Sequence, residues 1–138
     1  MFESLQKQQK LMDVWKKGKN EIKLKIDEQE IYEIMKMHPE YHKFFDSGDV
    51  FNMLNKKEKT NPFFHIILHT LVKKQVDERE PGIVRAAYHH LVNNKDIDSH
   101  EAYHGFMIIL ADEMHDMMKR RGKLNMERYK SRIEKFLE

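Results

Sequence analysis

The apolar residues of this chain recur at helical spacing, and its five glycines and three prolines fall between the periodic stretches. In the longest stretch, the apolar positions alternate between four and three residues apart, which places them on one face of a helix. These positions are Tyr103, Met107, Leu110, Met114 and Met117. No segment shows a strand pattern. We therefore predict an all-α fold, an up-and-down helical bundle of about four main helices with an N-terminal helix and a C-terminal bracing helix.

Capping signals and breakers set the expected boundaries of these helices. Asp27 with Glu30 and Asp98 with Glu101 have the spacing of a capping box, and Asn61 before a proline suits a helix start. Proline also disfavours helical angles in the residue before it, so a break is expected near residues 37 and 38. The expected helices cover residues 2–17, 27–37, 39–45, 62–76, 82–92, 98–121 and 126–136, with one further helical turn at 51–54. All of them are expected to form a single domain, 1–138.

Composition excludes several classes of function. Lys and Arg total 25 against 23 for Asp and Glu, so a formal charge of +2 gives no electrostatic reason to expect nucleic acid or an anionic membrane as a partner. The chain has no cysteine, which rules out disulfides, thiolate metal sites and cysteine nucleophiles. No apolar run approaches the roughly 20 residues that a membrane span needs. We expect a cytoplasmic protein, and one of bacterial origin.

Six of the nine histidines form three pairs spaced four residues apart, whereas random placement would give roughly half of one such pair. Two residues at this spacing lie on one face of a helix, one turn apart. A helix can therefore offer both imidazoles to one ion. The pairs are His38 and His42, His65 and His69, and His100 and His104.

Two of these pairs are expected to point into the bundle or along its seam. His65 and His69 share a face with Leu68 and Val72, and the second pair runs beside the core stripe of its helix. Buried imidazoles are costly unless their polar atoms find partners, and a divalent metal ion would supply one. The candidate ligands are His65, His69, His100 and His104, joined by His38, His42 or Glu101.

The segment His100 to His104 reads HEAYH, which matches the H-E-x-x-H pattern of zinc proteases. The glycine-spaced third histidine of one large protease class is absent, and His115 lies three turns along the same helix, too far to share the ion. Proteolysis is therefore disfavoured. Glu101 is instead expected to bridge, to support a ligand, or only to cap the helix. Taken singly, His89, His90 and His115 are more typical of structural residues than of ligands, with His90 facing inward and His89 exposed.

In order along the chain, the motifs HPEYH, NPFFHIILH, PGI and HEAYH resemble those of a small bacterial family catalogued as a domain of unknown function. The resemblance covers roughly residues 38–122. Many members of that family have an acidic residue at the position of Ile108, which this chain lacks. More distantly, the pairs of histidines are similar in architecture to hemerythrin-like and DinB-like metal-binding bundles, without reproducing the hemerythrin ligand order.

Two classes of function remain open. The first is a metal-binding helical bundle with a divalent transition metal, in one or two ions, iron being slightly favoured over zinc. Its role would be redox or oxygen chemistry, or metal-assisted hydrolysis, on a small molecule or oxygen. The catalytic residues, if the chain is an enzyme, are unknown. The second is a non-enzymatic bundle that acts through protein partners, with structural histidines or a structural zinc. An oligomer is compatible with either.

Overall fold

The computed structural model describes residues 2–48 and 61–138 of the chain. These residues form helices joined by short turns and contain no strand, so the predicted all-α helical bundle is confirmed. The chain divides into two compact units, Met1–Thr70 and Leu71–Glu138. The predicted helical turn at 51–54 lies outside the described residues, and the single-domain prediction stays a prediction. Within the described ranges, no helix combines the length and apolar character needed to cross a membrane.

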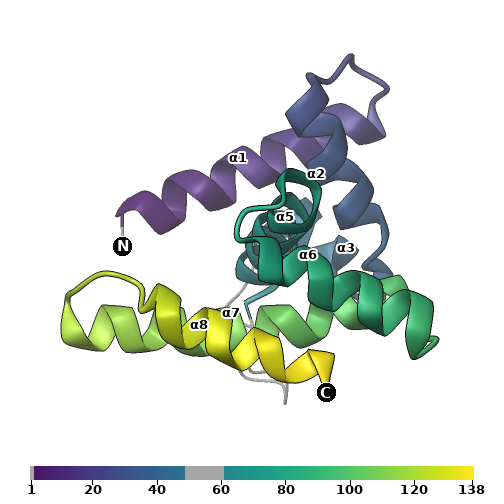
Figure 1. The fold of residues 1–138 in the computed structure, drawn as a ribbon. Helices are drawn as coiled ribbons and strands as arrows, with labels where there is room; N and C mark the ends of the chain where they lie inside the picture. Colours follow the sequence, from purple (N-terminus) through teal and green to yellow (C-terminus); the bar gives the residue numbers. More distant parts are fainter. Residues whose placement is uncertain (1, 49–60) are drawn as a thin grey trace. The chain divides into compact units, whose positions relative to one another are not determined.

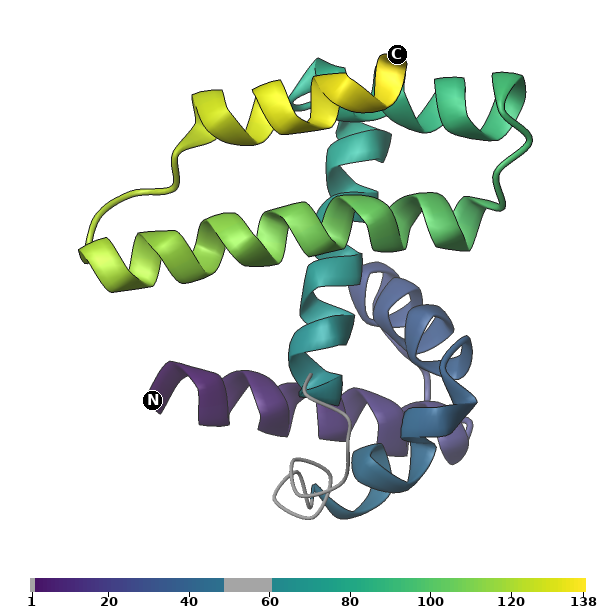
Figure 2. The same ribbon diagram turned by 90° about the horizontal axis from the view of Figure 1, so that it is seen from below.

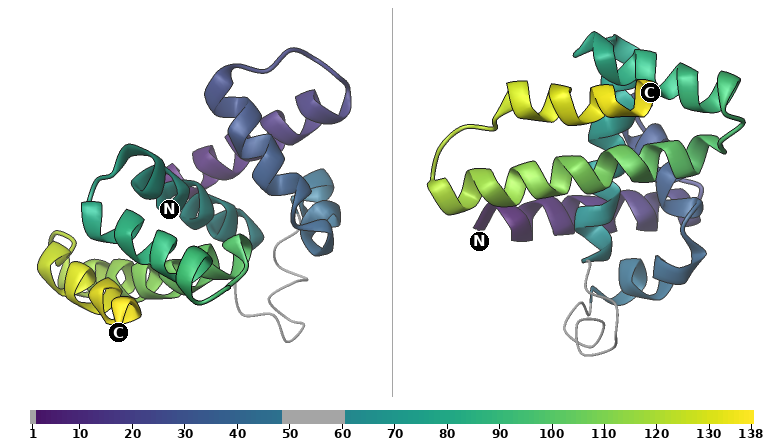
Figure 3. Two further views of the ribbon diagram at one scale, coloured as in Figure 1. Left: turned by 45° about the vertical axis from the view of Figure 1, so that its right-hand side comes forward. Right: turned by 60° about the horizontal axis from the view of Figure 1, so that its bottom comes forward.

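The first unit contains α1 (Phe2–Lys19), α2 (Ile26–Lys36), the 3-10 turn η1 (Pro39–Tyr41), α3 (His42–Ser47) and the first part of α5 (Pro62–Glu78). Helix α1 packs against both α2 and α3 (Figures 1 and 3). Their apolar faces enclose one cluster of buried side chains. It consists of Leu11, Trp15, Ile34, Met35, Phe45, Phe63 and Ile66. Because Phe63 and Ile66 belong to α5, this cluster fixes the rotation of that helix.

Helices α1 and α2 approach closely at Gly18. A Cβ atom on this residue would collide with the ring of Tyr32 from α2. Glycine is therefore required here by space, although the sequence predicted it only as the end of the first helix. The helix in fact continues to Lys19.

The predicted capping box of Asp27 and Glu30 is wrong. Helix α2 begins at Ile26, and its N-cap is Lys25, whose backbone N–H donates to Glu28 Oε1 at 3.0 Å. Glu28 stands three residues after Lys25 and so has the reach that a capping-box glutamate needs. Asp27 lies in the first turn, where its charge is favourable to the helix dipole.

The predicted break before Pro39 is confirmed. Helix α2 ends at Lys36, and His38 has φ −122° and ψ 67°, outside the helical region. This is the restriction that a proline imposes on its preceding residue. The expected helix over 39–45 is divided into the 3-10 turn η1 and the short helix α3. As a result, His38 stands on an irregular segment and His42 begins a separate helix.

The second unit contains the rest of α5, α6 (Gly82–His89), a π-helical turn η2 (His90–Asn94), α7 (Ser99–Arg120), α8 (Met126–Glu134) and the 3-10 turn η3 (Lys135–Leu137). The expected helix over 82–92 thus changes to π geometry after His89. Helix α8 packs against α6 and α7 and lies alongside α7 (Figures 1 and 2). Its Tyr129 and Ile133 are fully buried, as expected of a bracing helix.

A buried carboxylate, which the sequence did not single out, joins α7 to α8. Glu113 is 2% exposed, and both of its oxygens accept hydrogen bonds at 2.9 Å from Arg128 Nε. Arg132 Nη1 also donates to Glu113 Oε2 at 3.0 Å. The hydrogen bonds from Arg128, then those from Arg132, hold the pKa of Glu113 below its ordinary value, against the opposing effect of burial.

Candidate metal centre

His38 is held in one orientation by a hydrogen bond to the end of α2. The side chain is 1% exposed, and its Nδ1 lies 2.8 Å from the carbonyl oxygen of Ile34. A carbonyl oxygen only accepts, so Nδ1 carries the proton and donates. In a neutral ring the lone pair is then on Nε2, so this is the atom through which His38 could bind a metal ion. Metal-binding histidines in proteins are commonly oriented by such a bond from the other ring nitrogen.

His65 and His69 lie one turn apart on α5. The start of this helix is fixed by Asn61, whose Oδ1 accepts from the backbone N–H of Phe63 at 2.8 Å, which confirms the predicted cap. His69 is 1% exposed, and its ring centroid is 5.4 Å from that of His38. His65 is half-buried, and its Nε2 lies 3.1 Å from His38 Nε2. Three imidazoles are therefore gathered within the first unit.

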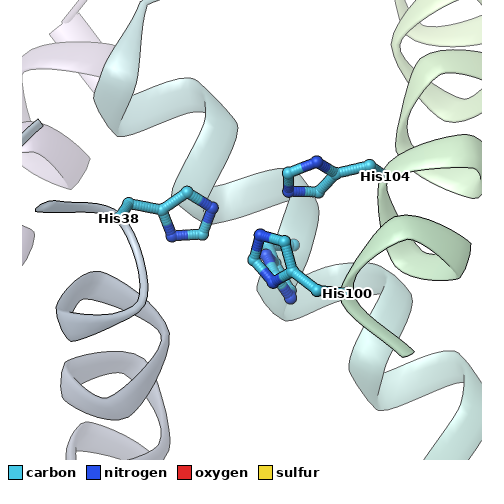
Figure 4. Close-up of side chains that lie close together, drawn as sticks. His38, His100 and His104 are labelled. Atoms are coloured by element: carbon cyan, nitrogen blue, oxygen red, sulfur yellow. The ribbon is translucent and has the colours of Figure 1, made fainter. Parts of the chain in front are cut away.

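His100 and His104 lie one turn apart near the start of α7. Asp98 caps this helix, accepting from the backbone N–H of His100 at 3.1 Å, so the Asp98 half of the predicted capping box is confirmed. The neighbouring Tyr103 is buried and fixes this face of the helix, while both histidines are half-buried. Their ring centroids are 4.1 Å apart, and the two rings project from the same side of α7 (Figure 4). The prediction that this pair shares one face is confirmed.

Four of the predicted ligands could hold a metal ion together. One ring nitrogen from each of His38, His69, His100 and His104 can be chosen so that all four lie within 4.8 Å of one another; Figure 4 labels three of them. An ion about 2.1 Å from each nitrogen would separate its ligands by about 3.4 Å in a tetrahedron and up to about 4.2 Å in an octahedron.

The other three candidate ligands occupy different surroundings. His65 is beside His38, as described above. The Nε2 atom of His42 donates to the carbonyl oxygen of Met35 at 3.1 Å, and its ring packs 4.5 Å from Trp15. The side chain of Glu101 is exposed. Their roles as ligands stay predictions.

Outside this group, His89 and His115 are exposed and His90 is half-buried, so His89 has the expected exposure. His100, His104 and Ile108 follow one another at intervals of four residues on α7. The side chain of Ile108 is 66% exposed, so this face of the helix is open to solvent at that point. Sequence reasoning did not assign a role to Tyr41, whose ring stacks on that of His38 with centroids 5.8 Å apart and planes 8° apart. A Pro-Glu-Tyr segment after a ligand has no pattern that would reveal this contact.

The chemistry of the group follows from its donor set. All four donors are neutral imidazoles, which suit iron, zinc, nickel and copper and suit magnesium and calcium poorly. A protease would need its glutamate beside the ion, and Glu101 of the HEAYH segment is exposed.

One family model matches residues 3–135 of the chain, and its description is "Domain of unknown function (DUF1841)". This agrees with the resemblance carried by the four motifs. Neither the curated proteins nor the solved structures include a match to the chain.

Proposed function

Because the chain belongs to the DUF1841 family, whose function is unknown, we infer its role from its own residues. We propose that it binds one divalent transition metal ion. The ligands would be His38, His69, His100 and His104. The observation that carries the proposal is that one nitrogen from each of these four side chains lies within 4.8 Å of the others.

Burial and orientation support this assignment. His38 and His69 are each 1% exposed, so a metal ion bound to them would be largely shielded from solvent. The hydrogen bond from His38 Nδ1 to Ile34 orients the ring and places the lone pair on the opposite nitrogen, Nε2.

We favour iron over zinc as the bound ion. Zinc with four protein ligands is closed to further ligands, as in structural sites. Iron accepts six, so four imidazoles would leave two positions for oxygen or a small molecule. A redox or oxygen-handling role follows from iron, whereas a closed zinc site would instead stabilise a protein that acts through partners.

Metal analysis of untagged protein tests the proposal, because a nickel column would load the site artificially. We expect one ion per chain and, with iron, absorption bands in the near ultraviolet or visible range. His104→Ala should lose the ion. His89→Ala, which changes an exposed histidine of α6, should keep it.

The outcomes separate the alternatives. A colourless protein with one zinc ion would support the metal site but overturn the choice of iron. Wild-type protein that takes up no iron, zinc, nickel or copper after anaerobic reconstitution would overturn the proposed function.

A further inference from the structure

The hydrogen bond between His38 and His65 involves the nitrogen that His38 would use to bind metal. The two Nε2 atoms are 3.1 Å apart, which is a hydrogen-bond distance. Only one of them can carry the shared proton. Since His38 already uses the proton on Nδ1 to donate to Ile34, a neutral His38 must accept at Nε2. His65 Nε2–H is therefore the donor.

We propose that His65 restrains metal uptake by occupying the lone pair of His38 in the metal-free protein. The inference rests on the proposed function, in which that lone pair binds the ion. Metal entry breaks the hydrogen bond between the two rings and forms a bond from His38 Nε2 to the metal. His65 keeps its proton, so this step releases none.

The packing around the pair supports this role. The rings of His65 and His38 are nearly perpendicular, with centroids 4.8 Å apart and planes at 74°, and their Nε2 atoms lie 3.1 Å apart. Tyr41 contacts both rings, stacking on His38 and meeting His65 edge-on at 5.5 Å. These contacts with Tyr41 help to hold the two imidazoles in hydrogen-bonding geometry in the metal-free protein.

The comparison with His69 shows why His65 is given a separate role. Both histidines belong to α5, one turn apart, and both lie near His38. Only His69 is in the group of four whose nitrogens can meet at one ion. His65 instead presents its nitrogen to a ligand. It thus competes with the ion for His38, and the binding equilibrium includes the loss of this hydrogen bond.

Two substitutions separate this role from that of a ligand. His65→Phe keeps a ring but removes the donor. His65→Gln is the matched control, because its side-chain amide nitrogen can donate from nearly the place of the imidazole Nε2. The probe is zinc, titrated into metal-free protein in competition with a chromophoric chelator, with association followed by stopped flow.

We expect His65→Phe to bind zinc about threefold to tenfold more tightly than wild type and to bind it faster, since a hydrogen bond of ordinary net strength no longer has to break. His65→Gln should stay close to wild type. Weaker binding by His65→Phe would identify His65 as a ligand and overturn the inference. Unchanged binding by His65→Phe would also overturn it. Both results leave the proposed function standing. Wild-type protein without affinity for zinc would also overturn the inference, whereas only failure to take up iron, zinc, nickel or copper would overturn the proposed function.

A second measurement does not depend on the variants or on metal. Long-range proton–nitrogen NMR correlations of the metal-free protein distinguish the two neutral tautomers of each imidazole. We expect the proton of His65 on Nε2 and that of His38 on Nδ1. A proton on His65 Nδ1 alone would overturn the inference, even if the chain binds zinc tightly.

Discussion

Replacing His69 with leucine is expected to affect the metal-free and the metal-loaded protein differently. His69 is 1% exposed, and its α5 neighbours Ile66, Leu68 and Val72 are all buried. In the metal-free protein, the substitution exchanges a buried polar ring for an apolar side chain of similar volume. A buried group that loses its hydrogen-bonding partner costs about 1–3 kcal/mol of unfolding free energy. The variant should therefore still fold, with a Tm at most about 10 °C below that of wild type in the presence of a chelator.

The metal-loaded form should show the difference. At a free metal concentration of about 100 times Kd, binding stabilises the wild type by about 2.7 kcal/mol. For a chain of this length, that raises the Tm by roughly 10 °C. If loss of one of four ligands weakens binding about 100-fold, the same metal concentration equals the new Kd, and the stabilisation falls to about 0.4 kcal/mol. The rise in Tm of His69→Leu should then be only about 2 °C.

Thermal unfolding followed by circular dichroism, with and without a chelator, measures both effects on one sample. His115→Leu is the control, because this histidine is exposed on α7 and lies outside the group of four. It should keep the full rise in Tm on metal addition. An undiminished rise in His69→Leu would show that His69 is not a ligand. Equal losses of stability in both forms would show that it acts only by packing.

Three further predictions concern the fold. Glu113→Gln should make stability less sensitive to acid, because the arginine hydrogen bonds hold the pKa of Glu113 below its ordinary value of 4.5. The ionised carboxylate therefore contributes fully to the free energy of unfolding above pH 4.5, and this contribution is lost as the pH falls through the lowered pKa of the folded state. Urea unfolding across this pH range measures the difference between wild type and variant. Gly18→Ala should cost about 1–3 kcal/mol by collision with Tyr32, and much of this should return in the double variant with Tyr32→Leu. Tyr129→Phe removes the 2.6 Å hydrogen bond to Gln75 and should cost about 1 kcal/mol; a double-mutant cycle with Gln75→Leu should show coupling, and simple additivity would contradict it.

The fold could be predicted largely from local signals. Apolar periodicity and the caps at Asn61 and Asp98 identified helices whose starts the structure confirms. The cap of α2 was wrong because two acidic residues, Glu28 and Glu30, offer competing spacings, and the actual choice depends on where the chain leaves the preceding turn. The glutamate clamped by arginines could not be foreseen, because no pattern shows which charged residue of an amphipathic helix a neighbouring helix will cover.

The candidate site was predictable in its residue types but not in its final membership. Spacing alone shows that His100 and His104 share a face, and their rings do lie together. It cannot show which histidine of a broken pair turns inward. Pro39 places His38 on an irregular segment, where it is buried among the other histidines, and leaves His42 against Trp15. The rule of one turn between ligands fails wherever the helix that it assumes is interrupted.

The charge of the proposed site bears on what it would bind. Four neutral imidazoles leave a divalent ion with its full charge, and within the described group no carboxylate offsets it. Farther along α7, Glu113 and Asp116 are already paired with Arg128. An uncompensated ion in buried surroundings stabilises an anion strongly, because little solvent screens their attraction. A ligand that completes the coordination should therefore be anionic. Azide should alter the absorption of the iron-loaded protein at a lower concentration than a neutral ligand of similar size does. The reverse order would mean that other residues neutralise the charge of the ion.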